Sequence, residues 1–434
     1  MKRHKGGILL ADRKPASKKA EKKTRKKLAL RGVSGPQNDI QVGIDTPMFL
    51  IIMVLLVFGV IMMFSAGYAW AIEEGLEGTY YANRQIMMAA IGVAGMLVIS
   101  LIDYHFFQKE IIVAAAYFGA LALMICCFIP GIRSPHNYSY RWIKIGVEFQ
   151  PSEIGKLALI LVFAYFISLN YSRMKNYKVG VLPFMLLLGI YAVVLVKQPH
   201  FSATIIMVVI CFSMMLIGGV QIKHLVVMGI LAVIAIAGYM FYLTATGQFS
   251  YIQDRINCFL HPFDSRYETE TWQTRNSLIA IGSGGLFGLG LGNSRQKFLY
   301  LPESKNDFVF AVVCEELGFV GAMLVIVLFL MFIVRGFTIA CKAVDKSGML
   351  IASGITIQIG LQALLNIAVV SNAVPNTGVS LPFFSYGGTA LIMQLWEMGI
   401  LLNISRHAVV SSEEYERRKF KGISGAIKRI RGVE

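Results

Sequence analysis

Long apolar runs separated by short polar connections make up most of this chain. Ten runs approach the ~20 residues that an α-helix needs to cross a bilayer. They are continuously apolar, whereas strands of a membrane barrel alternate apolar and polar positions. The pattern predicts an all-α, polytopic membrane protein. The predicted spans cover residues 48–70, 84–102, 110–130, 152–170, 180–197, 202–219, 223–243, 309–335, 347–371 and 385–404.

The polar segments divide the chain into three predicted parts. Residues 1–46 form a Lys- and Arg-rich tail, expected to be disordered or to lie on the lipid surface. Residues 47–405 hold the membrane domain, and residues 406–434 form a second basic tail. An even number of spans places both tails on one side of the membrane.

A connection of about 65 residues, 244–308, separates the seventh and eighth spans. It is far longer than a usual helix connection, and its second half is rich in glycine yet apolar. We expect a folded extracytoplasmic loop, with a short helix at the outer interface and a turn that brings Arg295 and Lys297 near Asp307. A second outer loop, 371–390, contains the prolines and glycines typical of irregular backbone lining a cavity.

Composition supports a membrane protein, because 56% of residues are hydrophobic and only 15% are charged. Much of the excess charge of +16 lies in the two tails. Basic tails beside membrane spans mark the cytoplasmic side and contact anionic lipid, so we do not expect nucleic acid as a partner. The six cysteines lack ligand spacing, which predicts neither a disulfide framework nor a metal site. No cleavable signal peptide precedes the first span, which we expect to be an uncleaved anchor.

Charged side chains gather in the predicted outer loops. Arginine and lysine can hold a diphosphate by charge-assisted hydrogen bonds, so this face suits an anionic amphiphile. Snorkelling of the same cations at the interface is the open alternative for the loop at 131–151. The candidate binding residues in these loops are Arg141, Lys144, Arg295, Lys297 and Ser385, with Lys305 as a further cation.

Asp307 lies where the long loop gives way to the eighth span. Two roles are open for it: an N-cap of that helix, or a general base whose pKa is raised by burial or by neighbouring carboxylates. Glu315 and Glu316 follow within the apolar run, and we expect them to support the helix by bonding to neighbouring spans, with proton relay or metal binding as the open alternative. Glu153 and Lys156, spaced i,i+3, are expected to pair within one helix.

Three segments closely resemble the signature segments of the FtsW/RodA/SpoVE family, the shape, elongation, division and sporulation proteins. They read NYSYRWIKIGVEFQPSEIGKLA at 137–158, NSLIAIGSGGLFGLGLGNSRQKFLYLPESKNDFVFAVVCEELG at 276–318 and NTGVSLPFFSYGGTALI at 376–392. They occur in the family's order, and the resemblance covers about residues 48–406. The stretch GLGLGNSRQKFLYLPE is similar to the division and sporulation branch.

The resemblance implies a peptidoglycan glycosyltransferase that polymerises lipid II into β-1,4 glycan strands by inverting displacement of undecaprenyl diphosphate. It implies a class B penicillin-binding protein and other divisome proteins as partners. Asp307 matches the family's essential loop acid, so it is the expected base for the acceptor's 4-hydroxyl. Arg141 and Lys156 match charged family positions that bind the ligand or shape the site.

Two departures from the family pattern carry expectations of their own. His200 in PHFSAT stands where the family commonly has the Asp of PDLGT or PDFGT, which puts a carboxylate role there in doubt. Lys305 and Asn306 stand where the family has His-Thr, and a cation at 305 would depress the pKa of Asp307 if the two were close.

Other functions stay open from the sequence: a lipid II flippase or transporter, a non-catalytic division scaffold, or a RodA-type elongation polymerase. Transporters place their sites near the membrane midplane, whereas here the polar chemistry gathers in outer loops, which favours an enzyme. No cofactor is required by the sequence, and a divalent cation on the diphosphate stays open. We expect a multi-pass protein of the bacterial inner (plasma) membrane at the division septum, with both termini cytoplasmic and the active site on the outer face.

Overall fold

The computed structural model describes residues 40–41, 43–131, 133–136, 139–145, 147–230, 257–407 and 409–410. The chain divides into two units, Val42–Ala408 and a terminal unit of Met1–Gln41 with Val409–Glu434. In the terminal unit, β1 (Ile40–Gln41) pairs antiparallel with β5 (Val409–Val410). The predictions for the two basic tails fall largely outside the described residues.

The unit Val42–Ala408 is mostly helical, as its apolar runs predict. Short 3-10 turns, η1 (Tyr104–Gln108), η2 (Tyr171–Arg173) and η3 (Ser265–Tyr267), lie between or before helices. The helices of the described residues include α2 (Thr46–Glu73), α3 (Tyr80–Leu101), α4 (Glu110–Cys126), α5 (Pro151–Asn170), α6 (Tyr177–Gly180), α7 (Leu182–Lys197), α8 (Phe201–Ile217), α11 (Glu268–Gly284), α12 (Val309–Cys341), α13 (Lys346–Val370) and α14 (Gly388–Arg406).

Six helical segments in the described part of the chain are long and apolar enough to cross a membrane. They are Thr46–Glu73, Tyr80–Leu101, Pro151–Arg173, Tyr177–Lys197, Val309–Cys341 and Lys346–Val370. Two further apolar helices, α4 and α8, are 17 residues long. The seventh predicted span, 223–243, lies largely outside the described residues, so the number ten stays a prediction.

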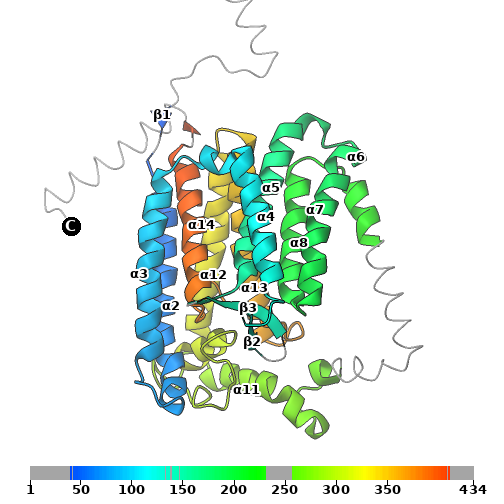
Figure 1. Ribbon diagram of the computed structural model, residues 1–434. Helices are drawn as coiled ribbons and strands as arrows, with labels where there is room; N and C mark the ends of the chain where they lie inside the picture. Colours follow the sequence, from blue (N-terminus) through cyan, green and yellow to red (C-terminus); the bar gives the residue numbers. More distant parts are fainter. Residues whose placement is uncertain are drawn as a thin grey trace, which may run out of the picture. The chain divides into compact units, whose positions relative to one another are not determined.

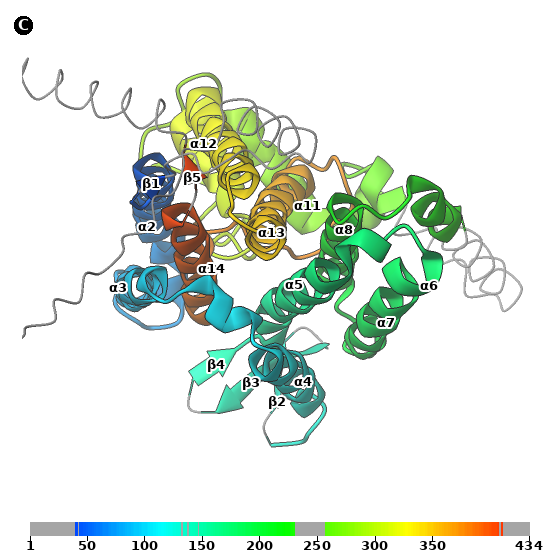
Figure 2. The same cartoon turned by 90° about the horizontal axis from the view of Figure 1, so that it is seen from above.

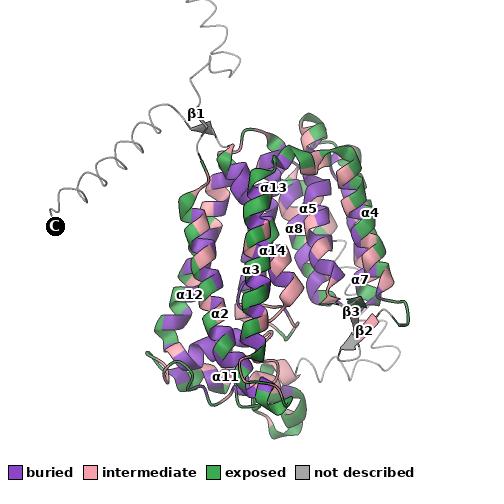
Figure 3. Cartoon of the chain, turned by 60° about the vertical axis from the view of Figure 1, so that its left-hand side comes forward, coloured by how far each residue is buried: buried purple, intermediate pink, exposed green. Residues whose placement is uncertain are grey.

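The centre of the bundle is formed by α13, α14 and α5. Seen along the bundle in Figure 2, α13, α14 and α5 lie between α2, α3 and α12 on one side and α4, α7 and α8 on the other. In the most apolar 18-residue stretch of each span, 72% is buried for α13, but only 33% for α3 and for the segment that joins α6 and α7. Figure 3 shows exposed residues along the outer helices, and many of these exposed residues are large and apolar, as on lipid-facing helices.

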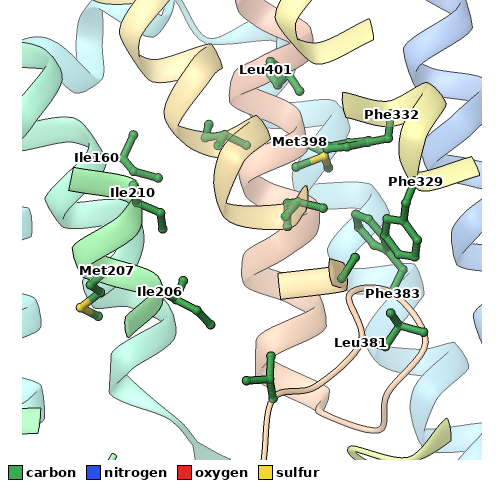
Figure 4. Packing of buried hydrophobic residues seen from close by; sticks show 14 of the residues in the cluster. Ile160, Ile206, Met207, Ile210, Phe329, Phe332, Leu381, Phe383, Met398 and Leu401 are labelled. Carbon is green, nitrogen blue, oxygen red and sulfur yellow. The ribbon is translucent and has the colours of Figure 1, made fainter. Parts of the chain in front are cut away.

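The hydrophobic core joins helices that are distant in sequence. Ile160 of α5 lies beside Ile210 of α8, while Phe332 of α12 points towards Met398 of α14 (Figure 4). Phe383, from the loop before α14, belongs to the same buried cluster. The core thus fixes the loop that precedes α14 as well as the helices.

A small antiparallel sheet interrupts the predicted all-α fold. Its strands β2 (Arg133–His136), β3 (Ser139–Ile145) and β4 (Val147–Phe149) lie in that order and pair Ser134 with Trp142 and Lys144 with Glu148. The sheet lies near the same end of the bundle as α11 (Figure 1). Strands this short leave no periodicity strong enough to distinguish them from a polar loop, which is why the sequence did not predict them.

The segment that follows α11 is inserted into the hydrogen bonding of α12. The amides of Phe319 and Val320 donate to the carbonyls of Gly285 and Leu286 at 2.9 and 3.1 Å. Gly318, at φ 66° and ψ −163°, breaks the helical geometry there. A Cβ on Gly318 would lie 2.3 Å from the amide nitrogen of Gly288, so only glycine fits this crossing.

Candidate active site

Asp307 lies in the loop immediately before α12. Phe308 holds the N-cap position of that helix and makes no side-chain capping bond, so the N-cap role considered for Asp307 is wrong. The side-chain amide of Asn366 in α13 donates to the backbone carbonyl of Asp307 at 2.7 Å and to that of Val379 at 2.6 Å. This amide ties the loop of Asp307 to the loop that precedes α14.

The carboxyl of Asp307 is set to titrate near neutral pH. Burial, assisted by repulsion from Glu303, raises its pKa to about 7, while the charge of Arg141 opposes the rise. Glycine at 378 leaves room beside it, because a Cβ there would lie 3.2 Å from Asp307 Oδ2. A carboxyl with this pKa can accept a proton at neutral pH.

Lys305 does not depress the pKa of Asp307. Its ammonium lies 3.0 Å from Glu74 Oε1 and 3.8 Å from the ring centre of Tyr81. The charges that shift the pKa of Asp307 are those of Glu303 and Arg141. We expected a cation at 305 to lower the pKa of Asp307 if the two were close. Instead, the Lys305 side chain is directed to Glu74 at the end of α2.

Arg141 reaches the site from β3. Its guanidinium donates a hydrogen bond to the carbonyl of Pro199, in the connection between α7 and α8. Its charge acts on Asp307 across the site. A half-buried arginine near the acid can meet a negative charge that develops during reaction.

Lys156 lies deeper, in the second turn of α5. Its ammonium is 2.8 Å from Glu153 Oε1 and donates at 3.1 Å to Gln362 of α13. In the same helix as Gln362, Gln358 donates at 2.9 Å to both oxygens of Glu397 in α14. These buried groups form a polar band through the three central helices, and they hold Lys156 in place.

Glu315 and Glu316 hold the inserted loop. Glu315 accepts hydrogen bonds from the hydroxyl of Ser294 and, at 3.0 Å, from the amide of Arg295. Glu316 accepts at 2.9 Å from the ammonium of Lys297, which is 3% exposed. That ammonium also donates to Ser65 and Gly292.

The structure therefore separates the candidate binding residues into two groups. Arg141 lies near Asp307, whereas all donors of Lys297 are used in supporting the loop. Arg295 and Lys144 are exposed, and the hydroxyl of Ser385 accepts from the amide of Leu381 at 2.8 Å to close a turn. The expected approach of Arg295 and Lys297 to Asp307 gives way to an approach by Arg141.

Sequence comparison identifies relatives over most of this chain. A family model described as FTSW_RODA_SPOVE, cell cycle protein, matches residues 45–409. The chain belongs to the FtsW/RodA/SpoVE family. It is 36% identical over 364 residues to a probable peptidoglycan glycosyltransferase FtsW of Geobacter sp. (strain M18), covering 84% of this chain and 97% of the relative. It is 36% identical over 367 residues to stage V sporulation protein E of Bacillus subtilis (strain 168), again covering 84% and 97%.

Solved structures share the fold of this FtsW/RodA/SpoVE protein. A chain described under "Structural coordination of polymerization and crosslinking by a peptidoglycan synthase complex" aligns with a TM-score of 0.69 at 22% identity, covering 84% of this chain and 98% of that one. The rod shape determining protein RodA of Thermus thermophilus aligns with a TM-score of 0.60 at 23% identity, covering 84% and 97%.

The departure from the family pattern at His200 has a physical account. His200 is 5% exposed, and its Nε2 lies 3.3 Å from the amide nitrogen of Gln150. Burial, followed by the charges of Arg141 and Lys156, lowers its pKa to about 3. The imidazole is therefore neutral at pH 7, and no carboxylate stands at this position to neutralise the two cations.

Sequence reasoning missed several residues that complete the site. Asn366 donates a hydrogen bond to the backbone carbonyl of Asp307, and Gly378 leaves room beside its carboxyl. Neither residue has a local sequence signal. Glu397 is a carboxylate inside an apolar helix, which is a recognised signal of a functional or structural polar contact. Within the described residues, no three His, Cys, Asp or Glu side chains are grouped so that they could hold a metal ion.

Proposed function

We propose that this chain is a peptidoglycan glycosyltransferase that polymerises lipid II into β-1,4 glycan strands, with Asp307 as its general base. Family membership and the names of its relatives support the activity. The observation that carries the assignment of the base is the Asp307 carboxyl, held at the loop end of α12 with a pKa of about 7. A base with that pKa is ionised in part at neutral pH and can accept a proton.

The reaction is a single displacement. The acceptor's 4-hydroxyl oxygen forms a bond to the donor's anomeric carbon, its proton passes to Asp307, and the bond from that carbon to the diphosphate oxygen breaks. The electron pair of that bond leaves with undecaprenyl diphosphate, and the anomeric centre is inverted. In this mechanism Arg141 meets the negative charge on the leaving diphosphate. Lys156 shapes the site through its buried contacts with Glu153 and Gln362.

Asp307→Asn tests the assignment, because asparagine keeps the shape but cannot accept the proton. With labelled lipid II and a class B penicillin-binding protein present, we expect polymer formation to fall by about 10² to 10⁴-fold. Asp264→Asn is the matched control, since Asp264 belongs to the same connection and pairs with Arg266. Polymer at the wild-type rate from Asp307→Asn would refute the assignment, and parallel reactions with and without Mg²⁺ would report any need for a metal.

The proposed setting is the bacterial inner membrane, crossed ten times, with both termini cytoplasmic and Asp307 on the outer face. Cations at the end opposite Asp307 support this orientation by the positive-inside rule; they are Arg173, Lys175, Lys178, Lys342 and Lys346. We propose septal or spore wall synthesis with a class B penicillin-binding protein and other divisome proteins, and contact between the basic tails and anionic lipid. Identity of 36% to FtsW and sporulation relatives supports that branch over RodA-type elongation.

A lipid II flippase is the second candidate, favoured by the buried polar band that ends at Glu397. Proteoliposomes that contain lipid II and this protein distinguish the two functions. Translocation that persists in Asp307→Asn, without polymerisation by the wild type, would favour the flippase. Polymerisation by the wild type that Asp307→Asn abolishes would favour the enzyme.

A further inference from the structure

Lys305 is enclosed by aromatic rings two residues before Asp307. Its ammonium lies 3.8 Å from the ring centre of Tyr81 in α3 and 4.9 Å from that of Trp70 in α2. It also pairs with Glu74 at 3.0 Å, and the hydroxyl of Tyr81 donates to the same carboxylate. The lysine side chain is 11% exposed, so these groups replace most of the water that a free ammonium would bind.

Three segments distant in sequence meet at this lysine. The amide of Tyr386, before α14, donates to the carbonyl of Lys305 at 2.8 Å. The indole of Trp70 donates to the hydroxyl of Ser304 at 2.9 Å, and the rings of Tyr81 and Tyr386 meet edge to face at 4.9 Å. The loop is thereby attached both to the α2–α3 hairpin and to the segment before α14.

We propose that Lys305 is a positioning residue whose caged ammonium latches the loop of Asp307 to the hairpin formed by α2 and α3. The part of this inference that concerns Asp307 as a base rests on the function proposed above. The latch itself does not, because it can be measured as order in the loop. The ammonium of Lys305 is directed to Glu74 and two rings, which favours a role in holding the loop over a role in binding a ligand near Asp307.

The latch sets how deeply Asp307 is buried. The charged groups that face Asp307 are Glu303 in its own loop and Arg141 from β3, while α13 contributes the neutral amide of Asn366. Loss of the latch loosens the loop that carries Glu303 and Asp307 and lets water reach the carboxyl of Asp307. We therefore expect a lower pKa for Asp307 and a weaker base.

The experiment compares Lys305→Met with Lys305→Arg, which keeps the charge. Hydrogen–deuterium exchange of residues 298–308 reports the latch, and the pH profile of lipid II polymerisation reports the base. For Lys305→Met we expect faster exchange, a kcat reduced by about 10- to 100-fold, and an acid limb moved down by about one pH unit. Lys305→Arg should restore all three.

Lys109→Met is the matched control, because Lys109 is an exposed lysine 5.0 Å from the ring centre of Phe106 at the other end of the bundle. If Lys305→Met does not fold, Glu74→Gln removes the latch's carboxylate from a side chain that is 43% exposed. Unchanged exchange overturns the latch, and faster exchange with an unchanged pH profile overturns positioning. Wild-type polymerisation by Asp307→Asn would remove the proposed base while the exchange result still decides the latch.

Discussion

At Asp307 the decisive balance is between burial with Glu303, which favours the protonated acid, and Arg141, which favours the carboxylate. A base must be ionised to act, so polymerisation should rise with pH through about 7, where the carboxyl titrates. Below that pH the raised pKa keeps the acid protonated and inactive. The neutral imidazole of His200 does not contribute a second transition in this range, because its pKa is about 3.

Arg141→Met is expected to move the acid limb to higher pH, since the charge that lowers the pKa of Asp307 is lost. The rate at the optimum should also fall by about 10²-fold, because the leaving diphosphate loses a cation. The measurement is kcat/KM against pH, with Arg141→Lys as the variant that retains the charge. A limb that moves to lower pH would contradict the placement of Arg141 beside Asp307.

Sequence alone could single out Asp307 but not its environment. A carboxylate at a loop-to-helix junction is visible as a costly position, and the family motif selects it. Whether Lys305 faces that carboxylate depends on the side to which its flexible chain turns, which local sequence does not determine. The pKa of Asp307 therefore depends on the folded structure, in which burial and Glu303 raise it and Arg141 lowers it.

Among the elements, α12 carries the strictest constraint, because the segment 285–290 is bonded into it around Gly318. Gly318→Ala is expected to lower the free energy of unfolding by at least about 3 kcal/mol, since a Cβ would meet backbone atoms and the φ of 66° disfavours alanine. Thermal unfolding in detergent measures the change.

Gly282→Ala provides the comparison for that substitution. Gly282 lies in α11 with nothing within 4 Å of its Cβ position, so alanine should be neutral or stabilise by up to about 1 kcal/mol. Equal effects of the two substitutions would show that the crossing of α12 and the loop does not depend on glycine.

Element boundaries were predictable where hydrophobicity determines them and less so elsewhere. The eighth predicted span begins at 309, where α12 begins, but α12 continues to Cys341 because helical hydrogen bonding does not stop where the apolar run meets Arg335. The Gly-rich segment could be recognised as folded, yet its insertion beside residues 315–320 depends on backbone groups that carry no sequence signature. The same holds for β2 to β4, whose pairing joins short strands of mixed polar and apolar residues.

At the scale of the whole molecule, the unit Val42–Ala408 has two chemically different ends. The sheet, α11 and the start of α12 lie at one end, and the connection between α12 and α13 lies at the other (Figure 1). The apolar pattern could predict this alternation of ends, because each span reverses the chain. It could not predict which loop residues meet, since those contacts join segments such as Trp70 and Ser304 that are far apart in sequence.

Cys341 offers a test of the proposed orientation, because it is exposed at the end of α12 that lies away from Asp307. In a variant without Cys126 and Cys258, a membrane-impermeant maleimide should label Cys341 only after the cells are permeabilised. A cysteine placed at Tyr300, which is 56% exposed in the loop before Asp307, should be labelled in intact cells. The reverse pattern would invert the protein in the membrane.

The length of α12 relates the position of Asp307 to the thickness of the membrane. The part of α12 that follows the break at Gly318 extends about 35 Å to Cys341 at 1.5 Å per residue, whereas the hydrocarbon core is about 30 Å thick. The helix between Gly318 and Arg335, which pairs with Asp45, therefore spans most of that core. In the proposed orientation, Asp307 lies beyond this span on the outer side, at the level of the headgroups, where a sugar joined to a lipid through a diphosphate resides. Under the proposed function, each sugar unit is added at the same distance from the membrane. The lipid carriers exchange by lateral diffusion in the leaflet and never leave it.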